Sequence, residues 1–207
     1  MDDRRGVFMV KSWGMLNEHL KYYSVVLASK SPRRQELLKG MGVPFVCITK
    51  ETPENHPEMP FEEVPEYLSL QKSLAFHEDE LPERYLLITA DTVVIAENEI
   101  LGKPRDRDDA IRMLQRLSGK SHHVVTGVTV RSAQKTVTFS VNSEVTFAEL
   151  DQEEIEHYID TYRPYDKAGA YGIQEWIGYV GIAGLNGSFY NVMGLPTRRL
   201  YQTLKCF

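Results

Sequence analysis

The strongest constraint on the fold is a continuous apolar run from Tyr85 to Ala90. A run of this length without polar alternation is typical of a strand that is buried on both faces. Asp91 follows directly, and a further β-type run, Thr92 to Ala96, comes after it. Because a buried carboxylate destabilises a protein unless it is paired or bound to a metal, we interpret Asp91 as a functional residue at the end of a buried strand.

An earlier stretch has the pattern of a strand, a tight loop and a helix. The apolar run Val25 to Leu27 is interrupted by Ser29 to Ser31, and Pro32 then opens a segment with helical spacing of apolar residues. Free N–H groups at a helix N-terminus attract anions, and hydroxyls and the guanidinium groups of Arg33 and Arg34 suit phosphate. The stretch indicates a phosphate-binding loop. The alternative is an ordinary connection with capping serines and solvated arginines.

The remaining chain continues this alternation of strands and helices. Two glycines end the first helix near residue 40, and Val43 to Ile48 follows as a second apolar strand. We therefore predict a β-α-β beginning. Further helices are predicted at 61–76, 105–117, 151–161 and 197–205, with a strand pair at 124–131 and 136–147.

The composition is ordinary for a globular protein and excludes a broadly basic surface. The chain has 207 residues, of which 42% are hydrophobic and 26% charged, and its net charge is -5. This charge gives no general attraction to nucleic acid or anionic lipid. No apolar run approaches the roughly 20 residues of a membrane span. We expect one domain or one unit of two lobes, no nucleic acid polymer or membrane as partner, and phosphate binding through locally placed cations only.

Cysteine and histidine spacing argues against a zinc site or a disulfide framework. Cys47 and Cys206 are far apart in the sequence, and the pair His122 and His123 has no cysteine or carboxylate at ligand spacing. The two cysteines fit a reducing compartment. The N-terminus also lacks the apolar core of a signal peptide, so we expect a cytoplasmic protein. Residues 1–14 show no clear element, and we expect a disordered extension or an upstream start choice there.

Several charged residues are candidates for a site beside the phosphate-binding loop. Glu51 stands just past the second strand, where α/β folds commonly place functional groups, whereas Glu54 is expected to be solvated. Lys72 lies between apolar positions of the predicted helix, although an exposed helix lysine is the simpler interpretation. Lys103 lies between a glycine and a proline, which hold its charge in place. The last third contains a stretch of small residues that ends at Gln174, whose amide is able to read a donor and acceptor pair on a base.

Six motifs, in this order, resemble the Maf family, also called septum formation proteins. The resemblance covers residues 23–205. Its carriers are Leu27 to Ser29 with Ser31 to Arg34 and Glu36 to Leu38; Ala90 to Val94; Leu101 to Pro104; Leu117 to Gly119 with His123 and Thr126 to Val128; Asp166 to Gln174; and Gly187-Ser188 with Asn191 to Pro196.

The resemblance implies an α/β protein with a two-lobed mixed sheet, flanked by helices around a deep central cleft, in a single domain at 15–207. It also implies a homodimer that hydrolyses a nucleoside triphosphate to the monophosphate and pyrophosphate, with a divalent cation, Mg²⁺ or Mn²⁺, as cofactor. The form seen here looks like the branch that acts on dTTP and UTP. The alternatives are the sister branch that prefers 7-methyl-GTP and a non-catalytic nucleotide-binding regulator of cell division.

The resemblance also assigns roles to individual residues. Asp91 is the expected catalytic carboxylate and, with Glu51, the expected metal ligand, and the sequence leaves open whether Asp91 acts chiefly as base or as ligand. Arg33, Thr92 and Gln174 fall at positions linked to substrate choice. The expected substrate-binding residues are Ser29, Ser31, Arg33, Arg34, Lys72, Thr92, Lys103 and Gln174.

Two positions depart from the family pattern. Lys50 stands where the family often has the first residue of an acidic pair, so that only Glu51 carries over. Arg163 stands where a glutamate is common before the proline. The first departure makes the alignment of the acidic segment after the second strand less firm than that of the other motifs.

Overall fold

A seven-stranded mixed sheet organises the computed structural model, which describes residues 15–207. The strand order is β2-β1-β3-β5-β6-β7, and β4 pairs with β3 beside this path. The expected extension at 1–14 lies outside the described residues. The strands are β1 (Ser24–Leu27), β2 (Val46–Cys47), β3 (Tyr85–Ala96), β4 (Glu99–Leu101), β5 (Ser121–Arg131), β6 (Thr136–Phe147) and β7 (Ile182–Asn186).

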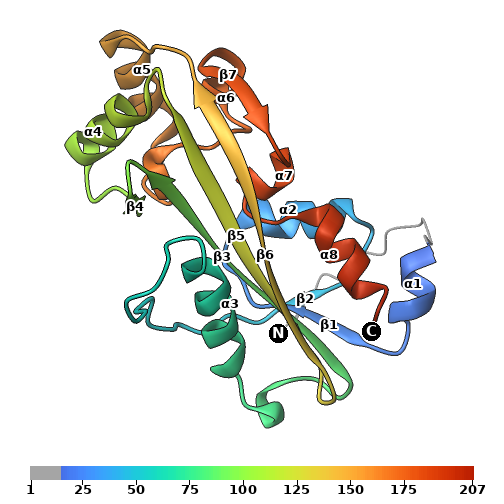
Figure 1. The fold of residues 1–207 in the computed structure, drawn as a ribbon. Helices are drawn as coiled ribbons and strands as arrows, with labels where there is room; N and C mark the ends of the chain where they lie inside the picture. The colour runs from blue at the N-terminus through green and yellow to red at the C-terminus, as the bar shows by residue number, and fades with distance from the viewer. Residues whose placement is uncertain (1–14) are drawn as a thin grey trace, which may run out of the picture.

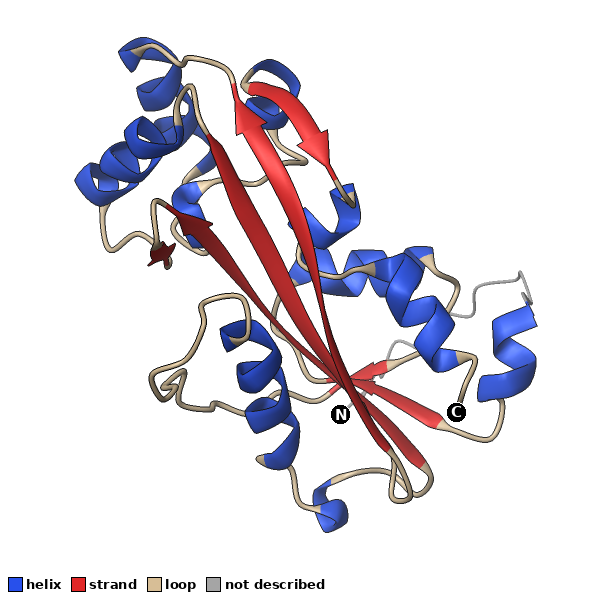
Figure 2. Cartoon of the chain, viewed as in Figure 1, coloured by secondary structure: helices blue, strands red, loops and turns tan. Residues whose placement is uncertain are grey.

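Helices cover both faces of the sheet and both of its ends. In Figure 1, β3, β5 and β6 run the length of the molecule, with α4, α5 and α6 gathered at one end and α1 and α8 beside the other. The helix α3 lies on one side of these long strands, and α2, α7 and α8 lie on the other (Figures 1 and 2). The helices are α1 (Met15–Leu20), α2 (Pro32–Gly40), α3 (Val64–Leu74), α4 (Arg107–Leu117), α5 (Gln152–Tyr162), α6 (Trp176–Val180), α7 (Phe189–Val192) and α8 (Thr197–Leu204), with short 3₁₀ turns η1 (Glu78–Glu80) and η2 (Ala168–Ala170).

Most of the predicted elements are confirmed. The β-α-β beginning is present, with β1 parallel to β2, and the strand pair at 121–147 is an antiparallel hairpin. The helix α5 begins with a capping box in which Asp151 and Glu154 each bond the other's backbone N–H, as is typical of such a sequence. The second strand, predicted at Val43 to Ile48, is much shorter, because only Val46 and Cys47 pair with β1.

Asp91 does not end a strand, as the sequence had suggested. The strand β3 continues through it to Ala96, because Asp91 pairs with Gly127 in an unbroken antiparallel ladder with β5. Gly127 is required at this point: a Cβ atom there would lie 2.2 Å from the Pro65 backbone. The absence of a side chain on Gly127 therefore lets the N-terminal turn of α3 approach the sheet opposite Asp91.

One edge of β3 is left open in its middle. The strand β1 pairs with β3 up to Ile88, and β4 pairs with it only from Val94 onward. Between these two partners, residues 89–93 have no strand neighbour on that edge within the described part of the chain, 15–207. Since side chains alternate across a strand, Asp91 faces α3 and Thr92 faces α2, and both are reached from the open edge. The fold thus exposes both faces of the sheet at one place.

The core extends along both faces of the sheet. The larger apolar cluster includes Leu27, Leu38, Ile88 and Val128, and a smaller cluster under α3 includes Val64, Leu68, Val93 and Val125. Within residues 15–207, no helix is long and apolar enough to cross a bilayer.

Candidate active site

A cavity of about 830 Å³ lies at the open edge of β3. It is lined by the loop before α2, part of the segment between β2 and α3, the middle of β3, the turn after β4 and the segment before η2. All but one of the residues expected to form the site line this cavity: Ser29, Ser31, Arg33, Arg34, Glu51, Lys72, Asp91, Thr92 and Lys103.

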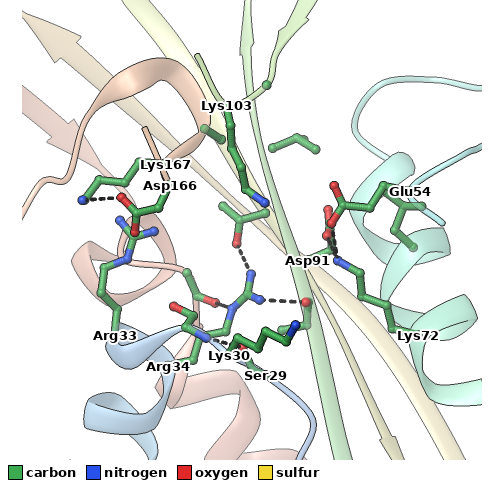
Figure 3. A pocket seen from close by; sticks show the side chains of 18 of the residues that line it. Ser29, Lys30, Arg33, Arg34, Glu54, Lys72, Asp91, Lys103, Asp166 and Lys167 are labelled. Atoms are coloured by element: carbon green, nitrogen blue, oxygen red, sulfur yellow. Dashed lines mark hydrogen bonds and ion pairs between the residues drawn. The ribbon is translucent and has the colours of Figure 1, made fainter. Parts of the chain in front are cut away.

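The carboxylate of Asp91 forms an ion pair with α3. Asp91 is 8% exposed, and its Oδ1 lies 2.5 Å from Lys72 Nζ. The same ammonium contacts Glu54 Oε1 at 3.0 Å (Figure 3). Lys72 therefore faces the site and is not an exposed helix lysine. The buried carboxylate of Asp91 is paired, as its burial requires.

Glu54, which was expected to be solvated, has a side chain that is 57% exposed, and its carboxylate also pairs with Lys72. Partial burial opposes ionisation of Glu54, but the hydrogen bond and charge of Lys72 outweigh it and hold the pKa of this carboxyl below its ordinary value. Glu51 also borders the cavity, yet its side chain is 92% exposed and pairs with Lys30 at 3.0 Å. Because the segment after β2 is an irregular loop, its sequence pattern did not indicate which glutamate turns toward Asp91.

The loop before α2 presents backbone and hydroxyl groups to the cavity. Ser29 is 7% exposed and its Oγ accepts a hydrogen bond from the Ser31 N–H. Ser31 is the N-cap residue of α2 but makes no side-chain cap hydrogen bond in the described chain. The N–H groups of the first turn of α2 are therefore not capped by this hydroxyl. Such a terminus is a suitable site for an anion.

The two arginines of the loop have different surroundings. Arg34 donates to Gly194 O at 2.8 Å, to Ala90 O at 2.9 Å and to Thr92 Oγ1 at 2.9 Å. It thereby joins α2 to the open edge of β3, and its burial lowers its pKa. Arg33 instead points toward Asp166 (Figure 3). Thus Arg34, expected to bind substrate, makes hydrogen bonds within the protein, whereas Arg33 faces the cavity.

Thr92 and Lys103 border the cavity from β3 and from the turn after β4. Besides accepting from Arg34, Thr92 Oγ1 lies 2.9 Å from Thr126 Oγ1, so its hydroxyl is held between fixed partners. The turn before Lys103 is anchored by the Gly169 N–H, which donates to Gly102 O at 3.0 Å. Figure 3 shows the Lys103 side chain extending into the space between Arg34 and Asp91.

Gln174 lies outside this set. It is not among the residues that line the cavity, and its Oε1 is buried without a hydrogen-bond partner within the described chain. Its expected role in reading a base stays a prediction.

A second charged cluster, Asp166, Lys167 and Glu175, was not predicted from the sequence. Lys167 Nζ lies 2.7 Å from Asp166 Oδ1 and 3.1 Å from Glu175 Oε1. Asp166 and Lys167 border the cavity. The signal was present, because both belong to one of the six motifs, but the spacing alone assigned them no role.

The carboxylates beside the loop suit a hard divalent cation. No group of three or more His, Cys, Asp or Glu side chains suited to a metal occurs among residues 15–207. Mg²⁺ usually takes only one or two carboxylates together with waters and substrate phosphates. Asp91 and Glu54 supply such a pair, and both face Lys72. The donor set therefore fits a hard divalent cation.

The family model described as Maf-like protein matches residues 24–207. The chain belongs to this family. Curated relatives agree with the match: the dTTP/UTP pyrophosphatase of Porphyromonas gingivalis (strain ATCC 33277) is 52% identical over 195 residues, which cover 92% of this chain and 97% of that protein. The proteins of the same name from Parabacteroides distasonis and Phocaeicola vulgatus are 50% and 48% identical, over 92% and 91% of this Maf-like chain and 99% and 98% of their own lengths.

A solved nucleoside-triphosphatase / dITP/XTP pyrophosphatase from Mycobacterium abscessus also matches. The similarity covers 87% of this Maf-like chain and 94% of the other, with a TM-score of 0.42 and 12% sequence identity. This likeness is too distant to bear on the function of the chain.

Proposed function

We propose that this protein hydrolyses dTTP and UTP to the nucleoside monophosphate and pyrophosphate with a divalent cation, Mg²⁺ or Mn²⁺. One observation carries the proposal: the buried Asp91 carboxylate and its partner Lys72 lie at the open edge of β3, beside the loop before α2. Carboxylates and cations are the groups that phosphoryl transfer needs. The names of the curated relatives support the choice of nucleotide.

The triphosphate is assigned to the positive wall of the cavity. Ser29, Ser31 and the N-terminus of α2 offer donors, and Lys72 and Lys103 offer two ammonium groups. Hydrogen bonds and cations placed in advance stabilise the charge that develops on departing pyrophosphate. These groups hold the α-phosphorus near Asp91.

Asp91 is the proposed catalytic residue. Its carboxylate orients a water molecule for attack on the α-phosphorus and accepts a proton from it. The new bond joins the water oxygen to the α-phosphorus, and the bond between this phosphorus and the bridging oxygen to the β-phosphate breaks. The electron pair leaves with pyrophosphate.

A divalent cation would be held by Asp91 with Glu54, or with Glu51. When bound, it neutralises phosphate charge and promotes ionisation of water. Glu54 is the better candidate, because it shares Lys72 with Asp91, whereas Glu51 pairs with Lys30 at the outer rim.

We also propose that the protein is a cytoplasmic homodimer. Cys47 and Cys206 are both free and exposed, which fits a reducing compartment. The edge strand β7 and its neighbours expose the apolar side chains of Tyr179, Leu185 and Tyr190. Exposed apolar side chains on an edge strand and on the helices that flank it in the sequence are suited to an interface with a second copy of the chain.

A steady-state screen of nucleotides tests the proposal. Purified protein with Mg²⁺ or Mn²⁺ is expected to release pyrophosphate from dTTP and UTP faster than from ATP, GTP, CTP and 7-methyl-GTP. Hydrolysis of 7-methyl-GTP alone would assign the sister branch. If the protein binds nucleotides but hydrolyses none of them with either metal, the protein is a nucleotide-binding regulator and not an enzyme.

A further inference from the structure

Asp166 and Lys167 of the second charged cluster border the cavity and form a wall that suits a different part of a nucleotide. Lys72 and the loop before α2 offer donors and cations, but Asp166 offers carboxylate oxygens, which only accept hydrogen bonds. A phosphate oxygen needs a donor, so Asp166 is a poor phosphate ligand. A nucleobase with an N–H group is a suitable partner for it.

The position of Asp166 is fixed from behind. Lys167 has a side chain only 9% exposed, and its ammonium pairs with both Asp166 and Glu175. The other Glu175 oxygen accepts from the Tyr158 hydroxyl, which itself accepts from the Gly172 N–H at 3.0 Å. Because a buried lysine would destabilise the fold without such partners, Lys167 is held in one place, and so is the carboxylate it contacts.

Asp166 is nevertheless open on its cavity side. Its side chain is 63% exposed, in contrast to that of Lys167. Partial burial opposes ionisation of Asp166, but the hydrogen bond from Lys167 outweighs it, so that the pKa of this carboxyl lies below its ordinary value. The group is therefore a charged acceptor at neutral pH.

A donor lies beside this acceptor. Arg33, from the first turn of α2, points toward Asp166 (Figure 3). The wall therefore presents a charged acceptor next to a charged donor. The imide edge of uracil or thymine carries the complementary pair, the N3–H group next to a carbonyl oxygen.

We propose that Asp166 is a specificity-determining residue that accepts the N3–H of a uracil or thymine base, with Arg33 donating to a neighbouring carbonyl and Lys167 as the residue that positions Asp166. This proposal deepens the proposed function and rests on it. In the same pose, cytosine places its N3 acceptor against the Asp166 carboxylate and its amino donor toward Arg33, so both hydrogen bonds are lost. A site built around a hydrogen bond rejects an analogue that lacks the group far more strongly than an apolar pocket does.

The test compares UTP, N3-methyl-UTP and CTP. N3-methyl-UTP keeps the carbonyls and the triphosphate but has no N3–H group. With the wild-type protein, kcat/KM for UTP is expected to exceed that for N3-methyl-UTP and for CTP at least about tenfold, since a lost hydrogen bond to a charged group is worth roughly 1.5–3 kcal/mol.

The decisive variant is Asp166→Asn, whose amide presents either an oxygen or an NH₂ group. The ratio of kcat/KM for UTP to that for N3-methyl-UTP, and the ratio of kcat/KM for UTP to that for CTP, are both expected to fall about tenfold. The change should lie in KM rather than in kcat. Asp108→Asn, at an exposed carboxylate on α4 that does not line the cavity, is the matched control and should leave both ratios unchanged. An equal loss for all three nucleotides in Asp166→Asn, or no loss, would overturn the proposal.

The positioning role of Lys167 is tested with a double-mutant cycle. The measured quantity is the ratio of kcat/KM for UTP to that for N3-methyl-UTP. Lys167→Met should lose most of this discrimination, Lys167→Arg should keep part of it, and Lys167→Met should add little to the loss in Asp166→Asn. Fully additive effects of the two substitutions would contradict the positioning role of Lys167. Because Asp166 is exposed, its variant tests base choice even if Lys167→Met fails to fold.

Binding measurements separate this proposal from the proposed function. The α,β-methylene analogues of UTP and CTP resist cleavage, and calorimetric titration with them reports base choice without turnover. A protein that hydrolyses nothing but binds the UTP analogue in an Asp166-dependent way would keep the base assignment and lose the enzymatic one. Equal affinities for the two analogues would overturn the base assignment.

Discussion

Lys72 Nζ lies 2.5 Å from Asp91 Oδ1 and 3.0 Å from Glu54 Oε1. One ammonium on α3 thus holds two carboxylates that come from β3 and from the segment after β2. This arrangement brings charged side chains from three separate chain segments to the open edge of one strand.

Asp91→Asn is expected to lower kcat for dTTP hydrolysis by about a thousandfold or more, because proton acceptance and charge at the α-phosphorus are both lost. Lys72 keeps Glu54 as a partner, so the fold should remain intact. Pyrophosphate release and circular dichroism measure the two effects. Full activity in the variant would remove Asp91 from catalysis.

Glu54→Gln and Glu51→Gln form a matched pair for the cation site. Glu54→Gln should weaken Mn²⁺ binding to the protein and nucleotide about tenfold or more, because it removes one of the two carboxylates next to Lys72. Glu51→Gln should change it little. Mn²⁺ titration followed by electron paramagnetic resonance reports binding without turnover. A larger loss of Mn²⁺ affinity in Glu51→Gln than in Glu54→Gln would mean that Glu51 is the ligand.

Lys103→Ala is expected to reduce kcat/KM for dTTP by about a hundredfold, since its ammonium extends into the cavity (Figure 3). Lys50→Ala is the control. Its ammonium pairs with Glu80 at 2.8 Å in a partly exposed ion pair, which contributes little to stability or function. Equal effects of the two substitutions would mean that the triphosphate lies elsewhere.

Gly127→Ala should destabilise the protein by about 1–3 kcal/mol or more, because the added Cβ meets the Pro65 backbone at 2.2 Å and forces α3 away from the sheet. Gly40→Ala, in α2, is the control, as its Cβ has no neighbour within 4 Å among residues 15–207. Urea unfolding measures both variants. Activity should fall with Gly127→Ala as well, since α3 carries Lys72. A neutral result at Gly127 would contradict the close approach of α3.

Because the His122 side chain is buried, we predict that the protein loses stability in mild acid. Burial, with the charge of His123 as a smaller cause, lowers the pKa of His122 to about 4. The unfolded chain therefore binds this proton at higher pH than the folded chain, and the free energy of unfolding falls as pH drops from about 6.5 to about 4, by up to roughly 3 kcal/mol.

His122→Gln removes this titration, so its unfolding free energy should depend less on pH across the same window than that of the wild type. Chemical unfolding of both proteins at a series of pH values measures the difference between their free energies of unfolding. The contributions of carboxylates that are the same in both proteins cancel in this difference. Parallel pH profiles for the two proteins would contradict it.

Local patterns in the sequence predicted most elements of the fold. The apolar run at 85–90, the hairpin and the capping box at Asp151 depend on neighbours in the sequence, and all three are present. The predicted end of the strand at Asp91 was wrong, because a polar residue ends a strand only if its pairing ends, and Gly127 continues the ladder.

The candidate site was predicted in part. The motifs indicated Asp91, Lys103 and the loop before α2, and these residues do line one cavity. Glu54 was missed because its loop has no periodicity from which an orientation follows. The pairing of Lys167 with Glu175 was missed because the proximity of these two residues depends on the turn at η2.

By itself, the sequence determined most strands and helices and the resemblance that the Maf-like family match confirms, and it predicts phosphate binding by the loop before α2. These properties follow from hydrophobic periodicity and local chemistry. Only the tertiary structure decided which charges meet: Lys72 with Asp91 and Glu54, Arg34 with the edge of β3, and Arg33 facing Asp166. Such contacts depend on how the ends of β1 and β4 leave the middle of β3 open, which no spacing along the chain encodes.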